Sequence, residues 1–168
     1  EVPDLKFRLA ELYFEKSRFY FFRAQEAEDK ALRTKSPGEK EGFLDQKKQH
    51  AKESKEWAAR AVELYKEIRD RFPKYKRMPE VLFALGQSFW SNGQFQAAIE
   101  VYADLIRNFK DSPLISVAWG AFGEFYFQQG EVHKALKSYE EAALDTRSPV
   151  YGFALYKQAW CYYNMSKW

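Results

Sequence analysis

The sequence is poor in the residues from which most active sites are built. It has one cysteine and two histidines in 168 residues. His50 and His133 lie about 80 residues apart, and neither has a His, Cys or paired carboxylate at metal-ligand spacing. No nucleophile motif and no phosphate-cradling glycine loop occurs. These absences argue against an enzyme and predict neither a metal site nor a cofactor.

Disulfides and membrane spans are missing too. The single cysteine, Cys161, cannot form an internal disulfide, and its place among Ala, Trp and Tyr residues predicts a buried filler. No run of 18 apolar residues occurs, so we expect no membrane insertion. A formal charge of +3, with 30% charged residues of both signs, favours solubility and gives no indication of nucleic-acid binding. With 46% hydrophobic residues, the chain is large enough for one domain with a continuous core.

What the sequence does contain is one pattern that occurs twice between Pro79 and Pro149. Large apolar residues three and four positions apart form a stripe beside a small residue, and a polar turn with a glycine follows. Each copy predicts a helical hairpin, in which the turn glycine adopts a positive φ and the small residue lets the second helix approach. Corresponding residues are 37 positions apart: Leu82/Trp119, Leu85/Phe122, Gly86/Gly123, Phe89/Tyr126, Gly93/Gly130, Phe95/Val132, Ala98/Ala135, Tyr102/Tyr139 and Leu105/Ala142.

Serine–proline pairs mark the helix starts of the later hairpins. Ser112-Pro113 and Ser148-Pro149 each predict a capping hydroxyl with proline at the first helical position. Pro79 lies closer to its glycine, so that helix either starts one turn late or carries proline inside its first turn.

A third stripe is left without its partner helix. It consists of Tyr151, Leu155, Ala159, Tyr162 and Trp168, where the sequence stops. Because an unpartnered stripe exposes aromatic surface, we expect a fragment of a longer repeat array or an end that docks on something else. The chain also begins with Glu1 instead of Met, which leaves room for a removed upstream segment.

Residues 4–33 and about 39–72 predict two long facing helices, broken at Ser36-Pro37-Gly38. Ala61 and Tyr65 lie 37 residues before Ala98 and Tyr102, so residues 57–73 correspond to the second helix of an earlier repeat. Its first helix contains Ala10, which leaves about 39 residues inserted at the hairpin tip. Each arm would then be roughly 45 Å long.

The two long helices face each other along a seam of apolar or small residues, which are Ala10, Tyr13, Ser17, Tyr20, Ala24, Ala27 and Ala31 against His50, Ser54, Trp57, Ala61, Leu64 and Ile68. The projecting arm, about Ala24 to Trp57, has alanine and serine in this seam and few large apolar residues. Since small residues bury little area, we expect the arm to fray towards Pro37. Phe43 and Leu44 either close the tip against Leu32 or form an exposed partner contact. The five bases in residues 69–77 indicate a solvated loop or, alternatively, a contact for an acidic partner.

The repeated residues match the tetratricopeptide pattern of Trp/Leu, Leu-Gly, Tyr, Ala, Phe/Tyr, Ala and Pro, and the chain resembles that family. The resemblance implies an all-α fold, a right-handed superhelix (α-solenoid) of helical hairpins with an elongated first hairpin. Within one domain, 1–168, the hairpins would be 1–75, 76–112, 113–148 and an incomplete 149–168. The periods of 37 and 36 are similar to those of bacterial envelope members, such as outer-membrane assembly lipoproteins and Tol-Pal coordinators. That similarity implies a periplasmic or outer-membrane setting, with the cytoplasm as the alternative.

In this family, first-helix side chains that point away from the stripe line a concave groove. By register, the predicted partner-binding residues are Phe83, Gln87, Trp90, Glu124, Phe127, Gln128, Tyr156, Trp160, Tyr163 and Asn164. Further lining positions are Phe7, Glu11, Phe14, Glu15, Glu80, Ser91, Val117, Gly120 and Phe153. Rigid aromatics among amides and carboxylates suit a peptide groove, although the rings could instead pack repeat on repeat. Gly120 would open a pocket between Phe83 and Tyr156 or let a neighbouring helix close in.

The sequence therefore predicts a non-catalytic scaffold for protein partners, part of a bacterial envelope complex by resemblance. The lining lacks the Lys and Arg with which chaperone-binding members hold a C-terminal carboxylate, which argues against that class of partner. Two alternatives remain open. One is a glycan- or peptidoglycan-binding module, and the other is self-association through the arm or the incomplete last repeat.

Overall fold

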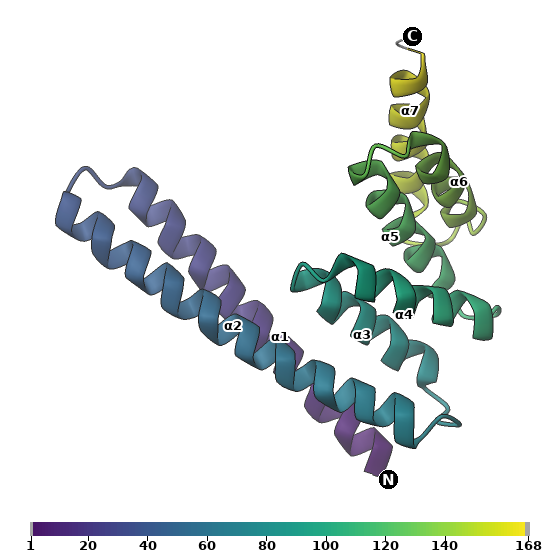
Figure 1. Cartoon of the computed structure of the whole chain (residues 1–168), viewed down its shortest axis with the longest axis horizontal. Helices are drawn as coiled ribbons and strands as arrows, with labels where there is room; N and C mark the ends of the chain where they lie inside the picture. Colours follow the sequence, from purple (N-terminus) through teal and green to yellow (C-terminus); the bar gives the residue numbers. More distant parts are fainter. Residues whose placement is uncertain (1, 167–168) are drawn as a thin grey trace. The chain divides into compact units, whose positions relative to one another are not determined.

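The computed structural model describes residues 2–166, and within that range the chain forms seven helices and no strand (Figure 1). Successive helices pair as hairpins, which confirms the predicted all-α class. The chain divides into two compact units, Glu1–Tyr75 and Lys76–Trp168, called unit 1 and unit 2 below.

Unit 1 is a single hairpin of two long helices, α1 (Val2–Arg33) and α2 (Pro37–Arg71). They have 32 and 35 residues, against 11 to 15 in the helices of unit 2, so the elongated first hairpin is confirmed. The break falls slightly earlier than predicted. Pro37 begins α2, because its ring fits the first helical turn, and the Ser36 hydroxyl caps the helix by accepting from the Glu39 amide at 3.5 Å.

The interior of unit 1 changes along its length. Near the base, Phe7 packs on Tyr65 and Tyr75, with ring centroids 5.9 and 6.5 Å apart. Towards the tip the buried residues of α1 are Ser17, Ala24, Ala27 and Ala31. Ser54 donates a hydrogen bond to the Ser17 carbonyl at 2.9 Å, so this part of the seam is small and partly polar.

Both helices continue to the tip of the hairpin, where Lys47 pairs with Glu28 across the hairpin at 2.6 Å and the Ser36 cap holds the start of α2. The expected fraying stays a prediction. Leu32 is 75% exposed, so closure of the tip against Leu32 is wrong. Its side chain lies on the outer side of α1, away from the seam residue Ala31.

Unit 2 contains five helices: α3 (Met78–Ser91), α4 (Phe95–Asn108), α5 (Ile115–Gln128), α6 (Val132–Ala142) and α7 (Tyr151–Met165). Each packs on its neighbours in sequence, most closely within the pairs α3–α4 and α5–α6, which makes two complete hairpins and one further helix (Figure 1). The turn glycines Gly93 and Gly130 have φ of 73° and 76°, as predicted.

The same glycine–tyrosine contact holds both hairpins of unit 2 together. A Cβ built on Gly86 would lie 2.7 Å from Cζ of Tyr102, and one built on Gly123 would lie 2.7 Å from Cζ of Tyr139. These distances are too short for real atoms, so only glycine lets the rings lie flat against the first helix. The predicted close approach is confirmed, and the tyrosine of the same hairpin is what makes it.

The observed starts of α5 and α7 differ from the predicted ones, and that of α3 settles an open alternative. Pro79 is the second residue of α3, so proline does sit inside the first turn. Helices α5 and α7 begin at Ile115 and Tyr151, later than predicted. The hydroxyls of Ser112 and Ser148 accept from the amides two residues ahead, at 3.3 and 3.4 Å, and form a turn that leads into each helix.

Candidate functional site

The predicted groove residues on α3 pack within their own hairpin. Phe83 lies against Tyr102, with ring centroids 5.9 Å apart, and Trp90 meets Phe95 edge to face at 4.9 Å. Both Phe83 and Trp90 are half-buried, whereas Gln87 between them is exposed. On α3, both rings therefore pack within the hairpin, and only part of each ring remains exposed.

Between α5 and α7, a cluster of polar groups links three helices. Lys157 of α7 pairs with Glu124 of α5 at 2.7 Å, and the Tyr139 hydroxyl of α6 donates to the same carboxylate oxygen. The Lys157 ammonium also lies 4.4 Å from the ring centre of Phe127. Glu124 and Phe127 are thus engaged inside the protein, and they fix α7 on α5.

Lys157 is the residue of this cluster that the sequence analysis did not place among the lining positions. A signal for it existed, since Lys157 is the one charged residue of α7 between Tyr151 and Met165. A lone cation in an otherwise neutral, aromatic helix indicates a specific partner. The repeat register passed over it because it lies between the positions that line the groove.

Burial governs the titratable groups around this cluster. It raises the pKa of the Tyr139 phenol well above its ordinary value, and the hydrogen bond to Glu124 raises that pKa further. Burial likewise raises the pKa of the Cys161 thiol. Cys161 is fully buried, as predicted, so the thiol is held in its less reactive protonated form.

Three of the predicted residues on α7 form an exposed aromatic group. Tyr156, Trp160 and Tyr163 are 59%, 43% and 53% exposed. Adjacent rings meet edge to face, with centroids 6.3 Å apart for Tyr156 and Trp160 and 5.8 Å apart for Trp160 and Tyr163. With Ala159 they line a hollow of about 280 Å³. These three rings are called the α7 aromatic cluster below.

Two polar residues complete the predicted set. The Asn164 amide donates to the Trp160 carbonyl at 2.8 Å, so it supports the end of α7 beside the α7 aromatic cluster. Gln128 is exposed at the last turn of α5.

A second face of α7 is exposed as well. Leu155 and Tyr162 lie on this face, and Ala159 lies between it and the α7 aromatic cluster. All three are exposed where α4 and α6 cover the corresponding residues of α3 and α5. The predicted uncovered stripe is confirmed for these residues, while its last member, Trp168, lies outside the described residues.

The structure contradicts the placing of Phe7 in the lining and excludes one of the two alternatives for Gly120. Phe7 is only 2% exposed, because it packs on Tyr65 and Tyr75, and therefore belongs to the core of unit 1. A Cβ on Gly120 would meet no atom within 4 Å, so no neighbouring helix closes in on that position.

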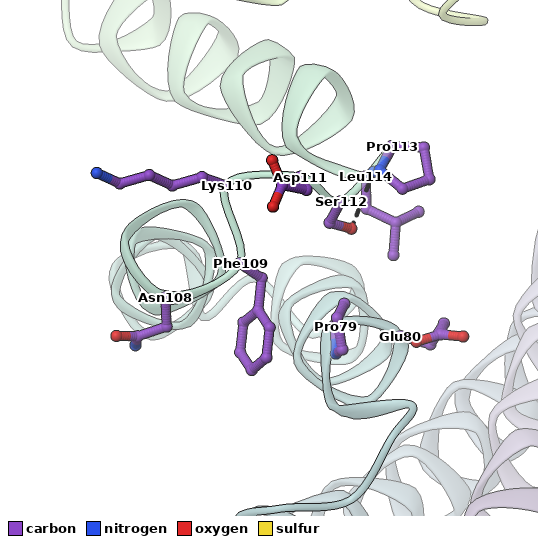
Figure 2. A pocket seen from close by; sticks show the side chains of 9 residues that line it. All are labelled: Pro79, Glu80, Asn108, Phe109, Lys110, Asp111, Ser112, Pro113 and Leu114. Carbon is purple, nitrogen blue, oxygen red and sulfur yellow. Dashed lines mark hydrogen bonds between the residues drawn. The ribbon is translucent and has the colours of Figure 1, made fainter.

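A larger cavity of about 490 Å³ lies at the loop edge of unit 2, where the start of α3 faces the connection from α4 to α5 (Figure 2). Its apolar wall includes Pro79 and Phe109, and Lys110 and Asp111 stand across from them. Glu80 is its one member among the predicted lining positions, and it pairs with Arg77 at 3.3 Å. Helical periodicity could not reveal this cavity, because loop residues form most of it.

Among residues 2–166, no group of three or more His, Cys, Asp or Glu side chains is arranged to hold a metal ion. None of the described helices combines the length and the apolar character needed to cross a bilayer.

The family comparison matches the repeated part of the chain. The family model described as "Tetratricopeptide repeat" matches residues 58–113 and 83–151, which together span more than half of the sequence. Comparison with curated proteins found no match. Tetratricopeptide repeats generally mediate protein–protein interaction and are generally non-catalytic scaffolds. From the repeated hairpins and this match, the chain belongs to the tetratricopeptide repeat family.

Proposed function

We propose that unit 2 holds a segment of a partner protein on the surface of its first-position helices α3, α5 and α7, with the α7 aromatic cluster as the main contact. The observation that carries this proposal is the exposure of Tyr156, Trp160 and Tyr163 side by side around one hollow. Exposed aromatic groups of this kind are typical of the centres of protein interfaces.

The physical basis is that the three rings are already arranged before a partner arrives. Each aromatic side chain brings a large contact area and loses only two torsions on binding. The edge-to-face contacts between neighbouring rings restrict those torsions further. Little conformational entropy is then lost when a partner segment orders on them.

The polar cluster beneath plays a supporting part in this proposal. Lys157, Glu124 and Tyr139 satisfy one another's charge and hydrogen bonding, so they hold the angle of α7 on α5 and α6. We assign these residues to positioning the aromatic surface, and Gln87 and Gln128 to hydrogen bonds with the partner backbone.

The setting of this scaffold is also a proposal. The long repeat periods support a place in a multiprotein complex of the bacterial cell envelope, by resemblance to envelope tetratricopeptide proteins. Locating the full-length protein by cell fractionation tests that assignment, and recovery in the cytoplasm alone would contradict it.

Pull-down from cell extract tests the contact itself. Trp160→Ala and Trp90→Ala should together remove partner recovery, because each deletes a large exposed or half-exposed ring. Tyr162→Ala is the matched control, since it removes a similarly exposed ring from the other face of α7. Unchanged recovery with the double variant, or equal loss with the control, would overturn the proposal.

Self-association through the long hairpin of unit 1 is a second candidate, and one observation favours it. The outer face of α1 carries exposed Leu5, Leu9, Leu12 and Phe19 at spacings of four, three and seven residues. Such spacing forms a stripe along one side of a helix, onto which a second copy could pack. Light scattering across a concentration series should then show a mass above 19.9 kDa that Leu9→Lys with Leu12→Lys abolishes. A constant monomer mass would exclude it.

A further inference from the structure

We propose that the partner segment held by the α7 aromatic cluster is a proline-rich stretch in the polyproline II conformation. This inference rests on the proposed function and adds the chemical class of the partner. Three features of α7 carry it: the charge of the surface, the hydrogen-bonding groups of its rings, and their spacing along the helix.

Between Tyr151 and Met165, the described helix α7 offers no unpaired charge to a charged partner. Lys157 is the one charged residue of the helix, its side chain is only 15% exposed, and Glu124 neutralises it at 2.7 Å. The ammonium also faces the Phe127 ring and not the α7 aromatic cluster. A strongly acidic or basic segment would lose its hydration on this surface without gaining an opposite charge, so a neutral partner is favoured.

The hydrogen-bonding groups of the rings favour a partner rich in acceptors. The Trp160 indole N–H can only donate, and the Tyr156 hydroxyl donates readily. Proline-rich segments present their carbonyl groups to the outside and have no N–H at each proline. A neutral surface of aromatic rings with N–H and O–H donors therefore complements such a segment better than it complements a helix, whose carbonyls are already used.

The spacing of the rings matches the repeat of a polyproline II helix. Tyr156 and Tyr163 are seven residues apart on α7, which corresponds to about 10.5 Å along the helix axis. Three residues of polyproline II advance about 9.3 Å. Prolines three residues apart could therefore lie beside Tyr156 and Tyr163 in turn, with Trp160 between them and the small Ala159 in the floor of the hollow.

Calorimetric titration with two synthetic peptides tests this inference on the intact chain. The first peptide repeats Pro-Ala-Ala, which places every proline on one face of a polyproline II helix. The second has the same composition with prolines two and four residues apart, so its prolines do not share a face. We expect the first to bind, and Trp160→Ala or Tyr156→Ala to weaken it by about tenfold.

Tyr162→Ala controls for the loss of an exposed ring on the same helix and should leave affinity within about twofold. Because Tyr156 and Trp160 are exposed, their removal opens no core cavity, and circular dichroism of each variant checks folding. Equal binding of both peptides, no saturable binding, or binding that ignores Trp160→Ala would overturn the inference.

The same titration with an amphipathic helical peptide and with N-acetylglucosamine oligomers separates the remaining possibilities. If the helical peptide binds through Trp160 and the Pro-Ala-Ala peptide does not, the inference fails and the proposed protein-binding function stands. If only the sugar oligomers bind through Trp160, both fail and a glycan-binding module replaces them.

Discussion

Unit 1 and unit 2 are both built from antiparallel helices, yet different residues hold those helices together. In unit 2 each hairpin has one glycine covered by one buried tyrosine, Gly86 with Tyr102 and Gly123 with Tyr139. In the outer part of unit 1 the buried residues of α1 are small, such as Ser17 and Ala24, and the larger Tyr20 is only half-buried. Short hairpins thus concentrate their packing in one large contact, while the long hairpin distributes it over many small ones.

The difference predicts how each unit responds to damage. Removing a tyrosine ring from unit 2 opens a cavity. Because the helices of unit 2 are short, few other contacts within the hairpin compensate for that loss. Removing a side chain from the outer seam of unit 1 deletes one small contact among many. Five experiments test this comparison, ordered from the largest expected effect to the smallest.

Tyr139→Ala should have the largest effect, because Tyr139 is fully buried against Gly123. We expect a loss of about 3–5 kcal/mol in the free energy of unfolding. Tyr20→Ala, in the half-buried seam of unit 1, should cost less than half of that. Urea denaturation measures both, with hydrogen exchange assigning the change to a unit. Equal losses would show that the two interiors do not differ as described.

Gly123→Ala and Gly120→Ala form a matched pair within α5. A methyl group on Gly123 collides with the Tyr139 ring, which should cost about 1–3 kcal/mol of unfolding free energy. A methyl group on Gly120 meets open space and should stabilise the helix by about 0.5–1 kcal/mol. Thermal denaturation compares the two, and a shift of the same sign in both would rule out the glycine–tyrosine contact as the cause.

Lys157→Ala should remove the ion pair to Glu124 and the contact with Phe127. Because Glu124 keeps only the Tyr139 hydrogen bond, we expect a loss of about 1–3 kcal/mol in unfolding free energy. Lys157→Met retains most of the side-chain stem and separates the charge from the packing. A fully stable Lys157→Ala protein would indicate that α7 is held on α5 by other contacts.

Ser17→Ala combined with Ser54→Ala should change stability by less than about 1 kcal/mol, since both hydroxyls of the Ser17–Ser54 contact are removed together and only the Ser17 carbonyl loses a donor. Ser54→Ala alone removes the same donor and also leaves the Ser17 hydroxyl without the Ser54 hydroxyl, so it is the stricter comparison. Urea denaturation measures the change in stability, and hydrogen exchange assigns it to unit 1. A large loss in the double variant would show that the polar contact, and not seam length, holds the arm.

Alkaline pH should have no effect near neutrality and a destabilising one above about pH 10. Burial raises the pKa of Tyr65, Tyr102 and Tyr139, so the folded chain keeps phenol protons that the unfolded chain releases. Their contribution is complete below the ordinary tyrosine pKa and is lost as pH rises beyond it. Phenolate absorbance measures the ionisation of the tyrosines, and denaturation midpoints across the pH series measure the stability. Tyr102→Phe is the control, because it removes one of the buried hydroxyls. Tyrosines that all ionise near pH 10 without unfolding would contradict it.

Several features of the fold could be predicted because they depend on nearby residues. The stripe spacing identified the helices, and Gly93 and Gly130 marked the turns, since only glycine adopts a positive φ at little cost. The helix starts were less accurate. Ser112 and Ser148 close a turn before the helix, and a hydroxyl can cap either arrangement equally well.

The candidate site was predicted less completely. The repeat register placed Tyr156, Trp160 and Tyr163 at lining positions, and the structure brings these three together. The same register also placed Phe7 in the lining, where Tyr65 and Tyr75 instead bury it. Whether a ring faces solvent depends on what the other helix presents, and a periodic pattern within one helix does not contain that information.

The sequence by itself determined that this protein is a series of helical hairpins with an outsized first member, because periodicity, small residues and turn glycines act over short distances along the chain. Only the tertiary structure decided that Glu124 is engaged by Lys157 and Tyr139, and that the α7 aromatic cluster stays exposed. These outcomes depend on the rotation and crossing of helices far apart in sequence, which fix the distances between side chains.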